Sequence, residues 1–339
     1  MFQIAIVGAG VVANFHAAAI RSAAMKARGV CLRAVCDALQ VKADEFAAKN
    51  ECKPYTNPEE MLDKENIDVV ILSIPTFLHA DYVERCAARG KHVLCEKPME
   101  MSRKDAERIV ASRDRHGVKV MVAQVVRFWP GYVDVKRMYE EGELGDILMA
   151  VFSRSSTVPA RGGWIIDPEK GRGAIQDMHI HDIDFLTYMF GEAAHVYSHA
   201  VKDYTGCYDH VISSITFKNG IKAAAEAAFS MKNSYPFSSF FRVCGTKATV
   251  EYRYRAGVTN IRANAAAEMN VFKQGEAPVS SVPEDYDPFT RQLAYFLDCV
   301  EKNKEPEIVS LNDSLKSISL LDAIRESAET GKIISIANH

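Results

Sequence analysis

The sequence has no long apolar run, little imbalance of charge and no closely spaced pair of cysteines. Its longest apolar stretches fall well short of the roughly 20 residues that a membrane-spanning helix needs. Its 41 basic and 44 acidic residues leave a net charge of −3, which argues against nucleic acid or an anionic membrane as the main partner. The composition therefore predicts a protein that binds neither nucleic acid nor a membrane.

The use of cysteine points to a reducing compartment. The eight cysteines include no Cys-x-x-Cys pair, so a zinc ribbon is not indicated. Cys36, Cys95 and Cys244 interrupt apolar runs, which is typical of buried, reduced thiols. Residues 1–7 begin a strand directly and lack the basic, apolar and cleavage regions of a signal peptide. We therefore expect a cytoplasmic protein.

The length of 339 residues predicts about two domains, and the hydrophobic fraction of 48% is enough to bury a core in each. Residues 1–123 alternate short Val/Ile/Leu-rich strands with helical stretches, including one long helix expected over 11–26. Near-continuous apolar strands indicate a parallel sheet with helices on both faces. Residues 1–123 are therefore expected to form a doubly wound α/β domain.

The pattern changes over residues 124–339. A helix is expected over 173–190, and two more helices are expected to close the chain. Strands are expected at about 147–153, 195–201, 211–217 and 221–229, and a further pair of strands is expected over about 239–252. Asn219-Gly220 is a strong hairpin signal between two of these strands. This part is therefore expected to be an α+β domain with a mainly antiparallel sheet.

A glycine motif near the start of the chain predicts a dinucleotide site. Gly8-Ala9-Gly10-Val11-Val12-Ala13 follows a strand and opens a helix, which is the context that G-x-G-x-x-G/A requires. Gly8 permits the tight turn, and Gly10 lets the backbone approach a pyrophosphate. The N–H groups at Val11 and Val12 begin the helix, where an anion is favoured.

Asp37 ends the second predicted strand and indicates which dinucleotide binds. A carboxylate at this point can accept hydrogen bonds from the ribose hydroxyls of the adenosine, and it would repel a 2′-phosphate. Residues 38–41 provide no arginine to hold such a phosphate, although Lys42 is nearby. The sequence therefore predicts NAD as the cofactor, with NADP less favoured.

Glu96-Lys97-Pro98 stands at the carboxyl end of another apolar strand, the edge at which open α/β sheets bind ligands. Lys97 is placed to lie over the nicotinamide end and polarise a substrate oxygen, although a plain surface lysine is the alternative. The cis or trans state of the Lys97-Pro98 bond does not follow from the sequence.

Six motifs along the chain are similar to those of one family. They are Gly8-x-Gly10-x-x-Ala13, Asp37, Ser73-Ile74-Pro75-Thr76-x-x-His79, Glu96-Lys97-Pro98, Gly173-x-x-x-Asp177-x-x-x-His181-Asp182-Ile183-Asp184 and Glu326-Ser327-Ala328-Glu329-Thr330-Gly331. With these motifs the chain resembles the Gfo/Idh/MocA family of NAD(P)-dependent oxidoreductases, and its inositol dehydrogenase branch in particular. The resemblance implies a Rossmann domain followed by a domain with an open-faced sheet. It also implies a homodimer or homotetramer formed through that sheet.

The resemblance further implies that Lys97, Asp177 and His181 form the catalytic set. Asp177 and His181 are four residues apart in a predicted helix, so their side chains share one face. In the implied reaction, hydride leaves a carbinol carbon while His181 accepts the hydroxyl proton. Lys97 stabilises the developing alkoxide, and Asp177 holds a substrate hydroxyl and tunes His181.

Further residues are expected around the cofactor and the substrate. Those expected near the cofactor follow the apolar strands and are Ser73, Pro75, Thr76, His79, Glu96 and Gln124. Arg127, Arg161 and Trp164 are candidates for substrate contacts, since Trp164 could stack on a sugar ring and Arg161 could bind hydroxyls. Ordinary packing at the domain junction or in the loop is the alternative for each of them.

The leading prediction is an NAD-dependent dehydrogenase that oxidises a secondary hydroxyl of a polyol, cyclitol or sugar to a ketone. One alternative is 3-oxidation of a sugar or glycoside that feeds, or forms part of, an oxidation–elimination cleavage. Another is a non-catalytic NAD(H)-binding regulator, against which the intact catalytic set argues. No metal is expected, because His179 lies on the opposite side of the predicted helix from Asp177 and His181.

Overall fold

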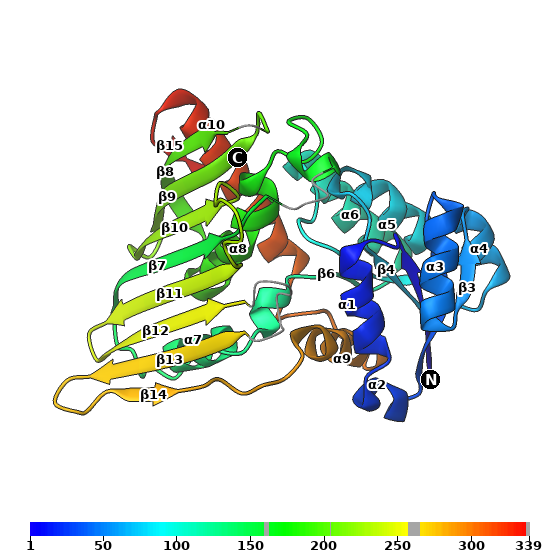
Figure 1. Cartoon of the computed structure of the whole chain (residues 1–339), viewed down its shortest axis with the longest axis horizontal. Coiled ribbons are helices and arrows are strands. Elements are labelled where there is room, and N and C mark those ends of the chain that lie inside the picture. Colours follow the sequence, from blue (N-terminus) through cyan, green and yellow to red (C-terminus); the bar gives the residue numbers. More distant parts are fainter. Residues whose placement is uncertain (159–162, 204, 257–264, 337–339) are drawn as a thin grey trace. The chain divides into compact units, whose positions relative to one another are not determined.

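The computed structural model describes residues 1–158, 163–203, 205–256 and 265–336. The chain forms two compact units (Figure 1). The first unit comprises Met1–Phe128 and Tyr286–Leu315, and the second comprises Trp129–Asp285 and Lys316–His339. From the sequence we also expect residues 1–123 to bind NAD and residues 124–339 to bind the substrate and form oligomers, and this division of roles stays a prediction.

The first unit contains a parallel sheet of six strands in the order β3-β2-β1-β4-β5-β6. Its strands are β1 (Phe2–Val7), β2 (Val30–Cys36), β3 (Lys53–Tyr55), β4 (Val69–Leu72), β5 (His92–Cys95) and β6 (Val120–Val122). All of β4 and the last four residues of β1 are buried, as the apolar runs predicted. Successive strands are added on one side of β1 up to β3 and on the other side from β4 onward. In open sheets, ligands bind at the switch point between two such strands, here β1 and β4. The predicted doubly wound fold is confirmed.

Helices alternate with these strands. They are α1 (Val11–Ile20), α2 (Ala23–Ala27), α3 (Gln40–Asn50), α4 (Pro58–Lys64), α5 (His79–Ala87), α6 (Arg103–His116) and α9 (Pro288–Glu301), with short 3₁₀ turns η1 (Thr76–Leu78) and η2 (Val125–Phe128). The single helix predicted over residues 11–26 is wrong, because it breaks at Arg21 and Ser22. The Ser22 hydroxyl accepts the Met25 N–H at 3.3 Å and so begins a new helix.

The second unit contains a mixed sheet in the order β14-β13-β12-β11-β7-β10-β9-β8-β15. Its strands are β7 (Ile147–Ser155), β8 (Ala193–Lys202), β9 (Tyr208–Phe217), β10 (Lys222–Ala228), β11 (Ser238–Gly245), β12 (Ala248–Arg255), β13 (Ala266–Lys273), β14 (Val279–Ser281) and β15 (Ile334–Ser335). Neighbours are antiparallel except β7 and β10. The predicted mainly antiparallel sheet and the hairpin at Asn219-Gly220 are confirmed.

Strand residues of this sheet alternate between a buried face and an open face. The buried face carries an aromatic cluster in which Phe241 stacks on Phe152 at 5.3 Å and on Tyr252 at 5.0 Å between ring centroids. On the open face, Met149 and Ile212 are 47% and 51% exposed. The helical segments of this unit are α7 (Tyr132–Glu140), η3 (Gly163–Ile166), a π-helical turn η4 (Ile175–His179), α8 (Ile180–Phe190) and most of α10 (Leu311–Thr330).

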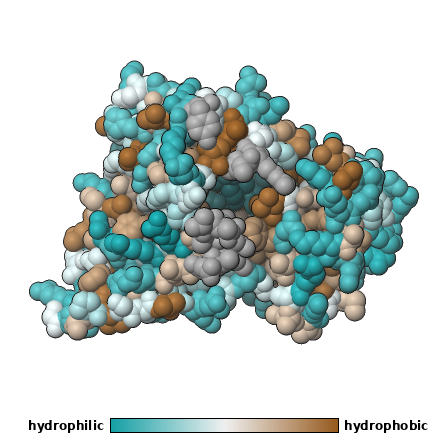
Figure 2. All heavy atoms as spheres, viewed as in Figure 1, coloured by the Kyte–Doolittle hydropathy of each residue, from teal (hydrophilic) through white to brown (hydrophobic). Residues whose placement is uncertain are grey.

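Hydrophilic residues cover most of the face shown in Figure 2, and hydrophobic residues are scattered among them. None of the described helices combines the length and apolarity that a membrane span requires. All eight cysteines are free thiols, and five of them are buried. Burial raises the pKa of the Cys36 and Cys86 thiols to about 12, so both stay protonated at neutral pH.

Candidate active site

The glycine turn after β1 is built into the first unit's sheet. Gly8 has φ +93°, and a Cβ there would lie 2.3 Å from the Ser73 carbonyl oxygen at the end of β4. The Gly8 N–H also donates to the Cys36 carbonyl oxygen of β2 at 2.7 Å. Only glycine allows this conformation and this close approach, so Gly8 joins the ends of three strands at the switch point.

Gly10 differs from Gly8 in that it leaves open space at the start of α1. Its φ is −80°, and a Cβ there would meet no atom of the described chain within 4 Å. The first turn of α1 carries no side-chain cap and no acidic residue, and Val11 is 65% exposed. The N–H groups of Val11, Val12 and Ala13 therefore begin an accessible helix, which fits the pyrophosphate of a dinucleotide.

Asp37 lies beside this turn, at the carboxyl end of β2. One carboxylate oxygen accepts the Ala9 N–H at 2.9 Å, and the other accepts the Leu39 N–H at 3.0 Å. These bonds fix the carboxylate against the glycine turn, while each oxygen keeps a lone pair for a ribose hydroxyl. Leu39 is 57% exposed and offers an apolar surface next to it.

Three polar side-chain atoms at the same edge of the sheet lack a protein partner. Ser73 Oγ, Thr76 Oγ1 and Gln124 Oε1 are buried and have no hydrogen-bond partner within the described part of the chain. Leaving such an atom unpaired costs about 1–3 kcal/mol. This cost is recovered when a polar ligand or water meets these atoms, which agrees with the roles predicted for Ser73, Thr76 and Gln124.

His79, at the start of α5, is fully buried and connects two loops of this edge. Its Nε2 lies 3.1 Å from the Ile74 carbonyl oxygen, and its Nδ1 lies 3.0 Å from the Pro98 carbonyl oxygen. Burial lowers the pKa of His79, and the facing carbonyl oxygens of Ile74 and Pro98 oppose that shift. His79 therefore braces the loop that contains Pro75 and the loop that contains Lys97.

Lys97 stands out because of its surroundings. Between Val93 and Met101 it is the residue that is not buried, and the Lys97-Pro98 bond is cis. Three buried polar side chains tie this loop to neighbouring helices. Glu96 of the loop contacts His16 of α1, and Glu100 of the loop accepts the Ala80 N–H of α5. His79, at the start of α5, contacts the Pro98 carbonyl oxygen. The loop thus presents a single cation at the carboxyl edge of β5.

Asp177 and His181 lie in the second unit, in the π-helical turn η4 and at the start of α8. The continuous α-helix predicted over 173–190 is wrong in its first turns, because residues 175–179 form the wider π-helical turn, a feature frequent at functional sites. Gly173, with φ +70°, precedes it, and a Cβ there would lie 2.5 Å from Cys207 Cβ. From Gly173 to Thr187, Asp177 and His181 are the residues that are not buried.

Buried charges fix the start of α8 to the rest of the second unit. The Asp182 carboxylate accepts two hydrogen bonds from the Arg154 guanidinium of β7, at 2.8 and 3.0 Å, and both residues are buried. Asp184 accepts a hydrogen bond from the Ser317 hydroxyl of α10 at 3.2 Å. These contacts fix the backbone at the start of α8, and so they fix the position of His181, which precedes Asp182.

His179 faces the opposite way. It is fully buried, and its Nε2 lies 3.0 Å from the Ser213 hydroxyl oxygen of β9. Burial lowers the pKa of His179 to about 3. His179 is therefore part of the packing between η4 and the sheet.

We expect His179 to make the second unit sensitive to acid. Below the unfolded-state pKa of about 6.5, the unfolded chain binds a proton that folded His179 does not, so the unfolding free energy falls by about 1.4 kcal/mol per pH unit until about pH 3. Replacing His179 by glutamine should remove this contribution. Urea unfolding between pH 6 and pH 4, followed by the fluorescence of Trp129 and Trp164, measures the slope. Equal slopes for the wild type and H179Q would contradict the expectation, and the exposed His195 provides the control H195Q.

The residues predicted to bind substrate differ in their placement. The Arg127 side chain is completely buried, donates to the Ile308 carbonyl oxygen at 2.6 Å and lies 3.5 Å from the Asp313 carboxylate. Trp164 is half-buried in η3. Arg161 lies outside the described residues. A substrate role for these three residues stays a prediction.

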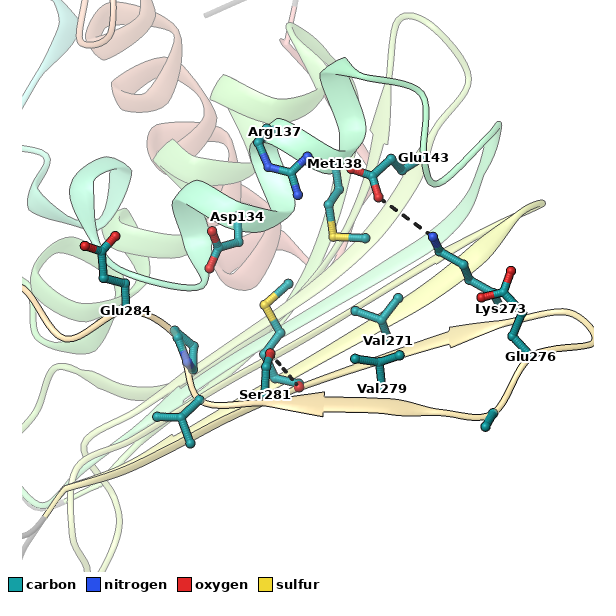
Figure 3. Close-up of a pocket in the computed structure, with 14 residues that line it drawn as sticks. Asp134, Arg137, Met138, Glu143, Val271, Lys273, Glu276, Val279, Ser281 and Glu284 are labelled. Carbon is teal, nitrogen blue, oxygen red and sulfur yellow. Dashed lines mark hydrogen bonds and ion pairs between the residues drawn. The ribbon is translucent and has the colours of Figure 1, made fainter.

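A groove in the second unit contains none of the predicted residues (Figure 3). It lies between α7 and the β13–β14 hairpin, with Val271 and Val279 along the hairpin. Lys273 lies 4.0 Å from the Glu143 carboxylate at one end. Its lining combines apolar residues with charged side chains such as Arg137 and Glu284.

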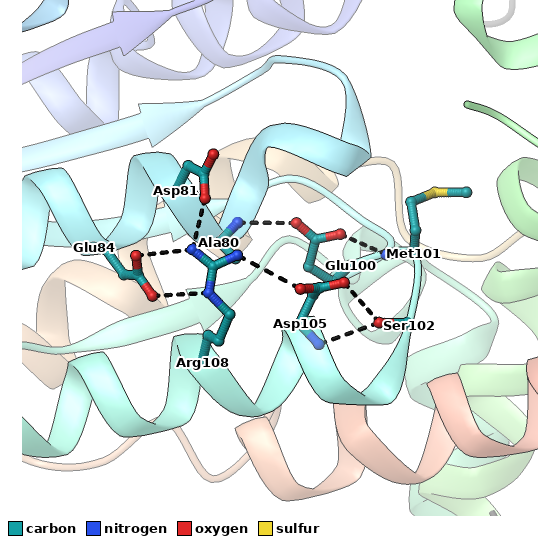
Figure 4. A network of polar contacts seen from close by, with 8 residues as sticks. All are labelled: Ala80, Asp81, Glu84, Glu100, Met101, Ser102, Asp105 and Arg108. Carbon is teal, nitrogen blue, oxygen red and sulfur yellow. Dashed lines mark hydrogen bonds and ion pairs between the residues drawn. The ribbon is translucent and has the colours of Figure 1, made fainter. Parts of the chain in front are cut away.

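Two anchors of the Lys97 loop do not follow from the sequence. His16 of α1 contacts Glu96. The Glu100 carboxylate accepts the N–H groups of Ala80 at 3.0 Å and Met101 at 2.6 Å (Figure 4). A lone histidine in an alanine-rich helix and a glutamate two residues after a proline were the available signals. Neither signal indicates which residue His16 or Glu100 contacts.

The fold and the polar groups at the carboxyl edge of the first sheet define a dinucleotide-binding α/β protein with a second α+β unit. Residues 2–124 match the model described as an oxidoreductase family with an NAD-binding Rossmann fold, and residues 132–251 match the GFO/IDH/MocA C-terminal domain. The chain belongs to the Gfo/Idh/MocA family of oxidoreductases, as the sequence motifs predicted, and its first unit carries the family's NAD-binding fold.

Relatives match the chain over nearly its whole length. It is 28% identical to the inositol 2-dehydrogenase of Rhizobium meliloti, over 99% of both chains. It is 27% identical to D-xylose 1-dehydrogenase (NADP(+)) 2 of Haloferax volcanii, over 91% of this chain and 97% of that one. A crystal structure of a putative NADPH-dependent oxidoreductase from Desulfitobacterium hafniense has the same fold, with a TM-score of 0.88, 22% identity and coverage of 99% and 98%.

Proposed function

We propose that the protein is an NAD-dependent dehydrogenase that oxidises a secondary hydroxyl of a polyol, cyclitol or sugar to a ketone. The observation that carries this proposal is the partial exposure of Lys97, Asp177 and His181 in segments that are otherwise buried. A lysine, a carboxylate and an imidazole are the groups that such a reaction needs. The relatives named for inositol and xylose support a substrate of this class.

Each residue of the set has a distinct role. Bound NAD supplies the hydride acceptor at nicotinamide C4. His181 takes the proton of the substrate hydroxyl on a ring nitrogen as the hydride leaves the same carbinol carbon. The Lys97 ammonium stabilises the negative charge that develops on the oxygen. Asp177 binds a neighbouring hydroxyl and orients His181. The products are the ketone, NADH and a proton.

A screen of neutral polyols tests this function. Purified protein with NAD is mixed in turn with inositols, aldoses, glycosides and sugar acids, and NADH fluorescence is followed. We expect steady NADH production with at least one inositol or pyranose. Retained NAD without net NADH, together with cleavage of a glycoside, would instead favour the redox-neutral alternative.

Asp37 supports NAD over NADP in this chain. Its carboxylate is held at the end of β2 by Ala9 and Leu39, where a 2′-phosphate would face a negative charge. Replacing Asp37 by serine should raise the ratio of kcat/KM for NADP to that for NAD by about 10–100-fold, a change of about 1.4–2.7 kcal/mol. Steady-state kinetics with both cofactors measures the ratio. The exposed Asp44 of α3 provides the control D44S, and an unchanged ratio in D37S would contradict the role of Asp37.

The open face of the nine-stranded sheet is proposed to be the surface through which homo-oligomers form. Met149 and Ile212 are half-exposed there on β7 and β9, and burying them against a second copy would stabilise the assembly. Changing both to glutamate should reduce the mass measured by light scattering at micromolar concentration, whereas V282E should not. A monomeric wild type would contradict this proposal.

A cytoplasmic location is proposed as well, since eight free thiols are stable in a reducing compartment.

A further inference from the structure

The loop that presents Lys97 is tied to α1, the helix whose N-terminus fits the pyrophosphate. His16, in the second turn of α1, is fully buried, and its Nε2 lies 2.7 Å from Glu96 Oε1. The other oxygen of Glu96 accepts the Lys97 N–H at 3.1 Å. The Glu96 carboxylate therefore connects His16 of α1 to the backbone of Lys97, although His16 and Glu96 are 80 residues apart in the sequence.

The rest of the His16 ring is enclosed by the first unit. Its Nδ1 is buried and has no hydrogen-bond partner among the residues that the structure describes. The ring packs against Phe289 of α9, with centroids 5.3 Å apart and planes at 87°. The contact with Glu96 is therefore the one hydrogen bond that the His16 side chain makes within the described part of the chain.

We infer that His16 is a positioning residue for Lys97. It acts through Glu96 and couples the cofactor-binding helix to the catalytic lysine. The inference rests on the role proposed for Lys97. His79 and Glu100 brace the same loop from α5, but His16 is the brace that comes from the helix that receives the pyrophosphate. Its loss should therefore reduce turnover more than cofactor binding, because the N-terminal amides of α1 are unchanged.

Two substitutions separate the hydrogen bond from the packing. Leucine at position 16 fills the apolar space but leaves the buried Glu96 without its partner, whereas glutamine places an N–H close to the position of the imidazole Nε2. We expect H16L to lower kcat at least tenfold, with KM for NAD changed less than threefold, and H16Q to keep kcat within threefold of the wild type.

The matched control lies at the other end of β5. His92 is half-buried, and its Nδ1 accepts the Lys119 N–H at 2.9 Å. H92L removes a histidine hydrogen bond from the same unit, far along the strand from Lys97. It should lower the melting temperature and leave kcat unchanged.

A second readout follows Lys97 itself. The rate at which Lys97 is acylated by an N-hydroxysuccinimide ester, measured by mass spectrometry on the NAD-bound protein, should rise at least threefold in H16L and stay within twofold in H16Q and H92L. Unchanged kcat or unchanged labelling in H16L would overturn the inference, as would equal losses in H16L and H16Q. If K97M keeps full activity, the role of Lys97 in the proposed function fails, while the labelling rates still decide the coupling.

Discussion

Replacing His181 by alanine should lower kcat by about 10²–10⁴-fold, the usual contribution of a positioned general base. His181 is half-exposed, and the start of α8 is held by Arg154 through Asp182, so the substitution should leave the fold intact. KM for NAD should change little, because the glycine turn and Asp37 belong to the other unit. Steady-state kinetics with the substrate found in the screen measures the effect.

Two comparisons make the His181 result specific. His116, exposed at the end of α6, provides the control H116A, for which we expect wild-type kcat. The melting temperature of H181A should stay within a few degrees of the wild type. If H181A keeps more than about a tenth of the wild-type kcat, His181 is not the required base.

Replacing Lys97 by methionine should lower kcat by about 10²–10³-fold, the effect of removing one group that stabilises a developing oxyanion. Methionine keeps much of the length of the side chain and removes the ammonium. The loop should persist, since Glu96, His79 and Glu100 hold it without the lysine side chain. Single-turnover formation of NADH, monitored by absorbance, reports this step without product release.

Lys91 provides the matched control for Lys97. It is a half-buried lysine just before β5, at the end of the strand opposite the candidate site. K91M should keep wild-type turnover. A rate for K97M equal to that of K91M would remove Lys97 from the catalytic set and leave His181 and Asp177 to be judged on their own variants.

The first unit could be predicted from the sequence because its signals are local. Apolar runs such as Val69–Leu72 define buried parallel strands, and Gly8 and Gly10 stand where the first strand meets the first helix. The break at Ser22 was missed because alanine favours helix on both sides of it. The Asn219-Gly220 turn likewise identified one hairpin of the second unit from two residues.

Elements that depend on distant partners could not be predicted. Ala266–Lys273 (β13) begins with alanines and carries few β-branched residues, and it is a strand because it pairs with β12 over its whole length. The π-helical turn at Ile175–His179 has the same apolar pattern as an α-helix, so periodicity does not separate the two.

The candidate site shows the same limit. Motifs singled out Lys97, Asp177 and His181, and the structure adds that they are the partly exposed members of buried segments. The sequence did not show that the Arg127 side chain is completely buried, or that His16 contacts Glu96. Both facts come from contacts between residues far apart in the chain, which no local pattern encodes.

The central claim, hydride transfer from a carbinol carbon to the nicotinamide, is tested most directly with a labelled substrate. The polyol or sugar identified in the screen is prepared with deuterium on the carbon that bears the oxidised hydroxyl, and it is incubated with the protein and NAD. We expect monodeuterated NADH and the matching ketone in equal amounts by mass spectrometry, with both products nearly absent in H181A. Ketone or cleavage product accompanied by unlabelled NADH, or by no NADH, would contradict it.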